Sequence, residues 1–260
     1  MSAAGVTGRA GVPGNGRVLA VTGGSRGIGA AIVRAAAAAG YAVCFSYARD
    51  RAAADALVAE LARAGRRAFA VQGDVAEASA AGDLFTEAER RFGPAAFAVC
   101  NAGITGGIGC FADLSEAALR RTIDVNLVGT LLTARAAVRR WQAAGTAGRL
   151  VLISSVAATS GAPGEYVHYA ATKAAIDAFA VGLGKEVAHA GIRVNAVAPG
   201  TADTDIHATG GDPDRPRRVA PRIPIGRVAR PDEIAQAVLW LLSDEASYVT
   251  ATVLRVGGGA

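Results

Sequence analysis

The stretch that decides the fold is Arg17-Val-Leu-Ala-Val-Thr22, followed directly by Gly23-Gly-Ser-Arg-Gly-Ile-Gly29. The first run is apolar and β-branched, which predicts a buried strand, and an alanine-rich helical pattern follows the second run through about Ala39. Glycines at 23, 27 and 29 permit positive φ and let backbone N–H groups approach a pyrophosphate above the positive end of that helix. A glycine loop between a strand and a helix predicts a dinucleotide-binding unit.

The same alternation of strands and helices continues along the chain. Further strands are expected at 41–46, 67–72, 95–100, 149–154, 192–197 and 252–256, and further helices at 51–64, 79–92, 115–144, 169–188 and 231–242. Because the strands are nearly continuous apolar runs, the pattern predicts an α/β Rossmann fold: a doubly wound, seven-stranded parallel sheet with helices on both faces. No linker divides residues 17–260, which we expect to form one domain after a loose tail at 1–16.

The composition excludes several classes of protein. With 52% hydrophobic and 19% charged residues, the 260-residue chain is too apolar for intrinsic disorder, and its arginines are too scattered to predict nucleic-acid binding. Three cysteines are too few for a disulfide framework, and Cys44 and Cys100 fall in predicted buried strands, so we expect a cytoplasmic protein. His168, His189 and His207 are isolated, so we expect no metal site, and no apolar stretch is long enough to span a membrane.

A doubly wound sheet binds ligands at the carboxyl ends of its strands, near the switch point in strand order. The residues that follow the predicted strands are small or hydrogen-bonding, which is the chemistry of a cofactor cleft: 23–29, 47–49, Asp74-Val75, Asn101-Ala102-Gly103, Ser154-Ser155 and Pro199-Gly200. Downstream, Tyr169 and Lys173 lie four residues apart, so a helix places them on one face. A nearby ammonium lowers the pKa of a phenol from about 10, which favours general acid/base chemistry. A solvated surface pair is the alternative interpretation.

The glycine loop and the Tyr169-x-x-x-Lys173 spacing together resemble the short-chain dehydrogenase/reductase family. The resemblance extends from Arg17 to Gly258 and includes the residues at the strand ends in their expected order. It implies a catalytic set in which Tyr169 transfers a proton, Lys173 also holds the nicotinamide ribose, Ser155 hydrogen-bonds the substrate oxygen, and Asn126 maintains a water-linked proton path behind Lys173. It further implies cofactor contacts from Gly23, Ser25, Arg26, Gly27, Ile28, Gly29, Tyr47, Arg49, Asp74, Val75, Asn101, Ala102, Gly103, Tyr169, Lys173, Pro199, Gly200, Thr201 and Thr204.

The sequence departs from the family pattern in three places. Ser155 is one residue farther from Tyr169 than in many relatives, which a one-residue expansion of 156–167 would explain, with Ser154 ending the strand. Cys100 stands where relatives usually have asparagine, and the adenine-ribose contact is expected to survive through 101–103. Ala251 stands where relatives often have glycine, and we interpret it as a packing residue.

The end of the second strand bears on the choice of cofactor. NAD enzymes need a carboxylate there for the ribose 2′-hydroxyl, whereas this chain has Tyr47, with Arg49 close behind. Arg26 and Ser25 can also reach a 2′-phosphate, which arginine binds through paired donors. We therefore expect NADP(H), with NAD(H) as the alternative if Asp50 supplies the carboxylate.

The segment from about 201 to 225 resembles a substrate lid, and closing lids of this kind exclude water. Its arginines could attract an anionic substrate, but the interspersed aspartates favour a solvated loop. We predict an NADP(H)-dependent oxidoreductase of a small carbonyl or secondary alcohol. A 3-oxoacyl-thioester (acyl-carrier-protein) reductase and a non-catalytic NADP-binding sensor or scaffold are the alternatives. The resemblance also implies a homotetramer, with the 170s helix and the last helix and strand as interfaces.

Overall fold

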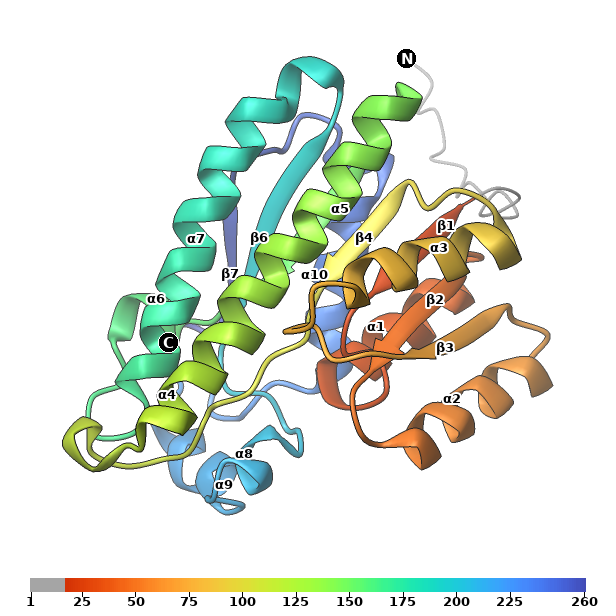
Figure 1. Cartoon of the computed structure of the whole chain (residues 1–260). Coiled ribbons are helices and arrows are strands. Elements are labelled where there is room, and N and C mark those ends of the chain that lie inside the picture. The colour runs from red at the N-terminus through yellow and green to blue at the C-terminus, as the bar shows by residue number, and fades with distance from the viewer. Residues whose placement is uncertain (1–16) are drawn as a thin grey trace, which may run out of the picture.

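The computed structural model describes residues 17–260, so the tail predicted at 1–16 lies outside the described residues. All seven strands join one sheet in the order β3-β2-β1-β4-β5-β6-β7, and every neighbouring pair is parallel (Figure 1). The strands are β1 Val18–Val21, β2 Ala42–Tyr47, β3 Ala68–Gln72, β4 Phe97–Cys100, β5 Arg149–Ile153, β6 Arg193–Pro199 and β7 Val253–Val256. The predicted Rossmann fold is confirmed, with its switch point between β1 and β4.

Helices cover both faces of this sheet. Helices α1 (Gly27–Ala38), α2 (Arg51–Arg63) and α10 (Pro231–Leu242) pack on one face, and α3 (Ala80–Phe92), α5 (Gly129–Ala144) and α7 (Val167–Val187) pack on the other. Figure 1 shows α3, α5 and α7 in front of the sheet and α10 behind it. Two hydrophobic cores therefore lie above and below the strands, as both-face burial of their apolar runs requires.

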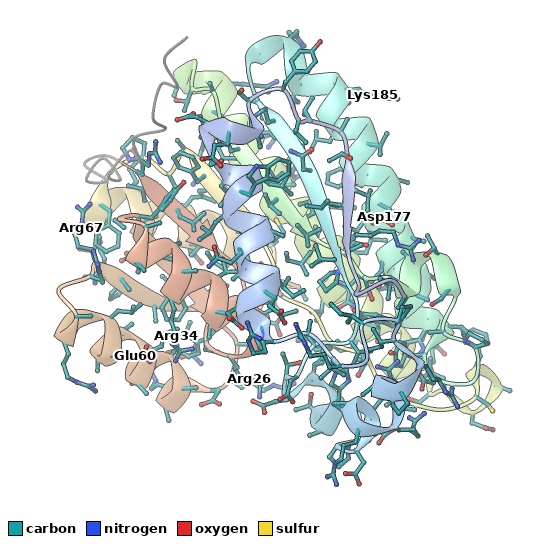
Figure 2. All side chains as sticks on the ribbon, turned by 180° about the vertical axis from the view of Figure 1, so that it is seen from behind. Arg26, Arg34, Glu60, Arg67, Asp177 and Lys185 are labelled. Carbon is teal, nitrogen blue, oxygen red and sulfur yellow. The ribbon has the colours of Figure 1, made fainter. Side chains whose placement is uncertain are left out.

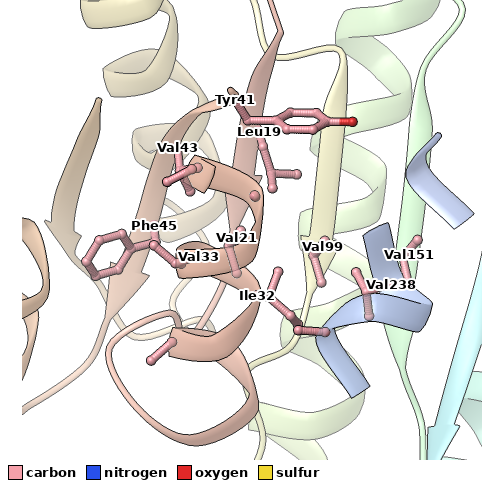
Figure 3. Close-up of a cluster of buried hydrophobic side chains, with 14 of the residues drawn as sticks. Leu19, Val21, Ile32, Val33, Tyr41, Val43, Phe45, Val99, Val151 and Val238 are labelled. Atoms are coloured by element: carbon pink, nitrogen blue, oxygen red, sulfur yellow. The ribbon is translucent and has the colours of Figure 1, made fainter. Parts of the chain in front are cut away.

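The core under α1 and α10 explains the alanine-rich composition of α1. Ile32 and Val33 of α1 meet Leu19, Val21 and Val43 of the sheet, all fully buried (Figure 3). Alanines occupy the remaining buried positions of this helix, so its axis can lie close to the strands and to α10. On the other face, Trp141 of α5 is buried and donates its indole N–H to the Ala95 carbonyl at 2.7 Å.

The predicted strand boundaries agree with the structure to within two residues, and the long helical region predicted over 115–144 is confirmed, with one internal irregularity that the sequence pattern does not predict. The structure divides that segment into α4 (Glu116–Ile123), one π-helical turn (Asp124–Val128) and α5. Short helices also form in segments for which no element was predicted: α6 (Ala157–Ser160), α8 (Ile206–Thr209) and α9 (Arg215–Val219). The last two lie together at the lower end of the molecule in Figure 1.

Ala251 has a φ of +57°, the left-handed region that favours glycine. A Cβ added to Gly184 of α7 would lie 2.8 Å from the backbone nitrogen of Ala251, so the two residues are closely packed. The interpretation of Ala251 as a packing residue was therefore incomplete, because backbone conformation also accounts for the glycine expected there.

The amino ends of β5 and β6 hold the end of α10. Arg149 and Arg193 are the first residues of these strands and are paired in register. Arg193 donates to the carbonyls of Leu241 and Ser243 at 2.9 Å, and Arg149 donates to that of Leu242 at 2.7 Å. Asp244 forms an ion pair with Arg149. The last carbonyls of a helix lack partners within the helix, so these two cations satisfy the end of α10.

Among the described helices, none is both long and apolar enough to cross a membrane.

Candidate active site

The glycine loop between β1 and α1 has a backbone that only glycine fits. Gly23 and Gly27 have φ values of +65° and +52°. A Cβ on Gly23 would lie 2.9 Å from the Ala102 Cα, and a Cβ on Gly29 would lie 2.1 Å from the Gly23 carbonyl oxygen. Asn101 holds the loop by donating its side-chain amide to the Gly23 carbonyl at 2.9 Å. The loop is therefore fixed at the N-terminus of α1, where backbone N–H groups and the helix dipole favour an anion.

A cavity of about 820 Å³ lies against this loop, along the carboxyl ends of the strands. Its walls come from segments far apart in the sequence: the glycine loop, the ends of β2 to β6, and the lid. Of the predicted site residues, all but Asn126 line it: Gly23, Ser25, Arg26, Gly27, Ile28, Gly29, Tyr47, Arg49, Asp74, Val75, Asn101, Ala102, Gly103, Ser155, Tyr169, Lys173, Pro199, Gly200, Thr201 and Thr204. The residues present fit a dinucleotide, because the glycine loop lines one wall of this cavity and lies at the N-terminus of α1, where backbone N–H groups and the helix dipole favour a pyrophosphate.

At the end of β2, the cavity wall is basic. Tyr47 is buried, and the exposed Arg49 follows it. Asp50 serves as the N-cap of α2, where its carboxylate accepts the Ala53 N–H at 2.9 Å. Arg26, at the start of α1, is exposed at the lower end of the molecule (Figure 2). Across residues 17–260, neither Arg26 nor Arg49 forms an ion pair within 4.0 Å, so both guanidinium groups keep their donors available.

Asp74, after β3, is already engaged. Its carboxylate accepts the Ala76 N–H at 3.1 Å and pairs with Arg121 of α4. Burial raises the pKa of Asp74, but the hydrogen bonds from Arg121 and Ala76 outweigh burial and hold that pKa below its usual value. Arg121 also lines the cavity. This role of Arg121 could not be predicted, because no pattern in the sequence of α4 indicates a partner 47 residues earlier.

Tyr169, Lys173 and Ser155 line the same cavity. The Lys173 side chain is only 4% exposed, donates to the Ile153 carbonyl at 2.7 Å, and places its Nζ 5.6 Å from the centroid of the Tyr169 ring. Ser155 lines the cavity, and its hydroxyl accepts the Ala157 N–H at 3.1 Å. Ser154 is buried and donates to the Lys173 carbonyl at 3.2 Å. Both serines line the cavity, and β5 ends at Ile153, one residue before Ser154, so the catalytic role assigned to Ser155 stays a prediction.

The acid/base properties of the pair differ from the expectation. Burial raises the pKa of Tyr169, which hydrogen bonding to Ser155 and the charge of Arg215 offset only in part. Burial lowers the pKa of Lys173 to about 8, which the charge of Asp177 offsets in part. The prediction that Lys173 lowers the Tyr169 pKa is wrong for the cofactor-free protein. Desolvation outweighs the attraction between the two groups, and it destabilises both the Tyr169 phenolate and the Lys173 ammonium.

Asn126 lies in the π-helical turn behind the cavity. Its side-chain oxygen accepts the Ile104 N–H at 2.8 Å, and its side-chain amide donates to the Ile104 carbonyl at 2.8 Å and to Thr172 at 3.2 Å. Asn126 therefore joins the loop after β4 to α7. A Cβ on Gly103 would lie 3.3 Å from the Asn126 side-chain oxygen and 3.6 Å from Lys173 Nζ, so both residues flank Gly103.

Thr201 and Thr204, the predicted cofactor contacts from the lid, both line the cavity and also contact other residues of the protein. Thr201 lines the cavity, but its hydroxyl accepts a hydrogen bond from Arg215 at 3.2 Å. Thr204 lies against Gly27, since a Cβ there would be 3.2 Å from the threonine methyl group. The sequence interpretation treated the lid arginines as a solvated group, whereas Arg215 lines the cavity together with Glu165 and Tyr166. Arg215 and Arg218 are three residues apart, so a helix places both on one face and Arg217 on another. This spacing is the feature of the sequence that distinguishes the two arginines that bind Glu165 from the solvated Arg217.

The described residues contain no group of three or more His, Cys, Asp or Glu side chains that could hold a metal ion. Cys44 and Cys100 are buried in strands, and Cys110 is exposed.

Comparison with known proteins gives the class to which this fold and site belong. A family model described as enoyl-(acyl carrier protein) reductase matches residues 23–260. An uncharacterised oxidoreductase of Escherichia coli, YgfF, is 42% identical over 244 residues, which cover 93% of this chain and 99% of the relative. L-rhamnose 1-dehydrogenase (NAD(P)(+)) of a Sphingomonas species is 38% identical over 94% of this chain and 96% of the relative.

The solved structures agree with these relatives. A short-chain dehydrogenase/reductase from Serratia marcescens superposes with a TM-score of 0.86 at 32% identity, covering 95% of this chain and 99% of that one. The chain belongs to the short-chain dehydrogenase/reductase family, an oxidoreductase family that uses nicotinamide cofactors.

Proposed function

We propose that this chain is an NADP(H)-dependent oxidoreductase that interconverts a small carbonyl compound and the corresponding secondary alcohol. One observation carries the proposal: Ser155, Tyr169 and Lys173 line the same cavity as the glycine loop that fits a pyrophosphate. A catalytic acid and a cofactor site in one cleft allow both reaction partners to be held within reach of each other.

The bound nicotinamide supplies or accepts the hydride. In the direction of reduction, the Tyr169 hydroxyl donates its proton to the carbonyl oxygen, and in oxidation the phenolate takes the proton back. The Ser155 hydroxyl donates a hydrogen bond to the same substrate oxygen, where negative charge develops during reduction. The Lys173 ammonium lies 5.6 Å from the centroid of the Tyr169 ring, where its charge favours the phenolate without offsetting the effect of burial on the Tyr169 pKa, and it would bind the nicotinamide ribose. Asn126 keeps the loop after β4 joined to α7, and so holds the Lys173 side of the cavity.

The preference for NADP(H) rests on the charges at the end of β2. A 2′-phosphate would meet Arg26 and Arg49, whose donors are not engaged by any carboxylate among residues 17–260. The one carboxylate that could replace them, Asp50, caps α2. Without a free acid for the 2′-hydroxyl, NAD(H) loses the contact on which it depends.

Replacing Tyr169 by phenylalanine tests the reaction. We expect kcat with NADPH and a panel of ketones, aldehydes and acetoacetyl thioesters to fall by roughly 10²–10⁴-fold, because the proton donor is lost while the ring remains. NADPH binding, measured by quenching of tryptophan fluorescence, should change little. Tyr248→Phe is the matched control, since Tyr248 is fully exposed and removed from the cavity. Undiminished turnover by Tyr169→Phe would refute the mechanism, and absence of turnover in the unmodified protein would favour a non-catalytic binding protein.

The cofactor preference is tested by steady-state kinetics with NADPH and NADH at equal concentrations. We expect a higher kcat/KM with NADPH, and about a tenfold loss of that preference in Arg49→Met, because a charge-assisted contact to phosphate disappears. Arg66→Met removes an exposed arginine that does not line the cavity, so it should leave the ratio unchanged. Faster turnover with NADH would assign the enzyme to NAD(H).

A 3-oxoacyl thioester of an acyl carrier protein is a second candidate substrate, favoured by the similarity of this chain to a 3-oxoacyl-[acyl-carrier-protein] reductase of a Synechocystis species, which is 37% identical over 94% of this chain and 96% of the relative. The acetoacetyl thioesters in the panel test it directly. A preference of at least tenfold in kcat/KM over simple ketones would support it.

A further inference from the structure

A group of ion pairs joins the lid to the turn that precedes α7, the helix that carries Tyr169 and Lys173. Arg215 of α9 donates to Oε2 of Glu165 through Nε at 3.1 Å and Nη2 at 2.8 Å, and it also donates to the Thr201 hydroxyl. The side chain of Arg215 is 11% exposed and that of Glu165 is 22% exposed, so this contact is largely shielded from water. An ion pair in such surroundings is screened less by salt than a surface pair.

Glu165 receives a second arginine from the same helix. Arg218 donates to the other carboxylate oxygen of Glu165 at 3.2 Å and pairs with Asp212, which also belongs to the lid. Burial raises the pKa of Glu165, but hydrogen bonding to Arg215 and to Arg218 outweighs burial and keeps that pKa below its usual value, so the carboxylate is ionised when the lid is docked. Two cations and two anions are thus balanced between the lid and the turn that precedes α7.

From this turn, a short path leads to the catalytic tyrosine. The Arg215 guanidinium lies 5.1 Å from the centroid of the Tyr166 ring. The Tyr166 ring in turn meets the Tyr169 ring edge to face, with centroids 5.2 Å apart and an interplanar angle of 85°. Tyr166 is buried between them. Both contacts are of recognised stabilising geometry, so the position of Arg215 affects the packing around Tyr169.

We propose that Arg215 is a positioning residue that couples closure of the lid to the acid/base function of Tyr169: docked on Glu165, it packs Tyr166 against the catalytic ring and directs its positive charge toward the phenol. This inference rests on the proposed function, since it assigns the lid a role in the ionisation of the proposed proton donor.

The charged and titratable groups around Tyr169 decide the direction of the effect. Lys173 comes from α7 itself, Ser155 from the end of β5, Tyr166 from the start of α7, and Arg215 from α9, with Glu165 beyond it. The charge of Arg215 lowers the pKa of Tyr169 against the larger effect of burial. Undocking of the lid withdraws this charge, which raises the pKa of Tyr169, and admits water, which lowers that pKa, so variants of the charged residues are needed to separate the two effects.

Two variants separate this electrostatic coupling from a merely mechanical attachment. Arg215→Met removes the cation, so the kinetic pKa of Tyr169 in the pH profile of kcat/KM should rise by about 0.5–1 unit. Glu165→Gln removes the anion that neutralises Arg215, so the same pKa should fall. A mechanical attachment is broken in both variants and would shift the profile in one direction only. Arg217→Met is the matched control, because Arg217 is on the same helix, is 88% exposed and pairs with the exposed Asp214.

The conservative variant Arg215→Lys keeps the charge and should leave the kinetic pKa within about 0.3 unit of the unmodified enzyme. If Arg215→Met fails to fold, Arg215→Lys and Glu165→Gln still give the sign. Opposite shifts in Arg215→Met and Glu165→Gln support the proposal, while equal shifts, or none, overturn it. The readout also works without a substrate. The absorbance of tyrosinate at 295 nm, titrated in each variant and corrected by the Tyr169→Phe protein, reports the same pKa. If no panel substrate is turned over but the Tyr169 absorbance titration shifts in opposite directions in the two variants, the proposed function is rejected and the coupling between Arg215 and Tyr169 is retained.

Discussion

Lys173 is one of only two lysines in a chain whose other 25 basic residues are arginines. Its ammonium is buried beside a phenol and a backbone carbonyl, and burial lowers its pKa to about 8. An arginine here would stay protonated and would present a planar guanidinium group, so it could neither release its proton near pH 8 nor fit the space of a compact ammonium. The other lysine, Lys185, is exposed near the far end of α7, away from Arg26 and the cavity (Figure 2).

The lowered pKa of Lys173 makes a prediction about stability. The unfolded chain keeps this proton up to about pH 10.4, whereas the folded, cofactor-free chain releases it near pH 8. The unfolded state therefore binds more protons between these values, and the contribution of Lys173 to the free energy of unfolding rises with pH there. Relative to Lys173→Met, the unmodified protein should gain about 1–2 kcal/mol between pH 7.5 and 9.5, as measured by urea denaturation.

Comparison with the variant is needed because Cys44 and Cys100 act in the opposite direction. Burial raises the pKa of both thiols to about 12, so the folded state keeps their protons longer and loses stability as pH rises through about 8.5. These effects are shared by the unmodified protein and the variants, and they cancel in the difference. Lys185→Met serves as the control, and an equal pH-dependent difference for it would contradict the assignment to Lys173.

At the level of the secondary-structure elements, the π-helical turn between α4 and α5 positions the rear of the site. This turn carries Asn126, and its backbone carbonyl accepts the Thr130 hydroxyl at 2.8 Å. Such single π turns interrupt α-helices frequently at functional sites. The helix resumes at Gly129, where a Cβ would lie 2.9 Å from the Val75 carbonyl oxygen and 2.8 Å from its side chain. Gly129 therefore lets α5 lie against the loop after β3 that carries Asp74.

Gly129→Ala tests this close packing. Alanine gains about 1 kcal/mol of helix propensity over glycine, but overpacking against a backbone carbonyl costs about 1–3 kcal/mol, so we expect net destabilisation. Gly82→Ala in α3 is the matched control, because a Cβ there meets nothing within 4 Å, and it should stabilise the protein by up to about 1 kcal/mol. Thermal denaturation of both variants gives the sign of each stability change. Stabilisation by Gly129→Ala would contradict the prediction, because it would show that Val75 moves away from the added Cβ without loss of stability.

For the whole molecule, the sequence is most informative where function depends on local pattern. Alternating apolar runs predicted the sheet, and the residues that the strand-end rule singled out nearly all line the cavity, although many other residues line it as well. Arg121 and Arg215 escaped prediction because their partners, Asp74 and Glu165, are 47 and 50 residues away and are brought near only by the fold. The π turn escaped for a different reason, since its residues have the same periodicity as the helices around it. The pKa of Tyr169 depends on desolvation, which spacing alone does not reveal.

The two edges of the sheet also differ in what they hold. The carboxyl edge carries the cavity, whereas at the amino edge Arg149 and Arg193 close the end of α10. Damage to the amino edge would lower the free energy of unfolding while leaving the residues that line the cavity in place, whereas substitutions at the carboxyl edge change the cavity itself. The stability of this protein can therefore vary through its amino edge without any change in the residues that select its substrate.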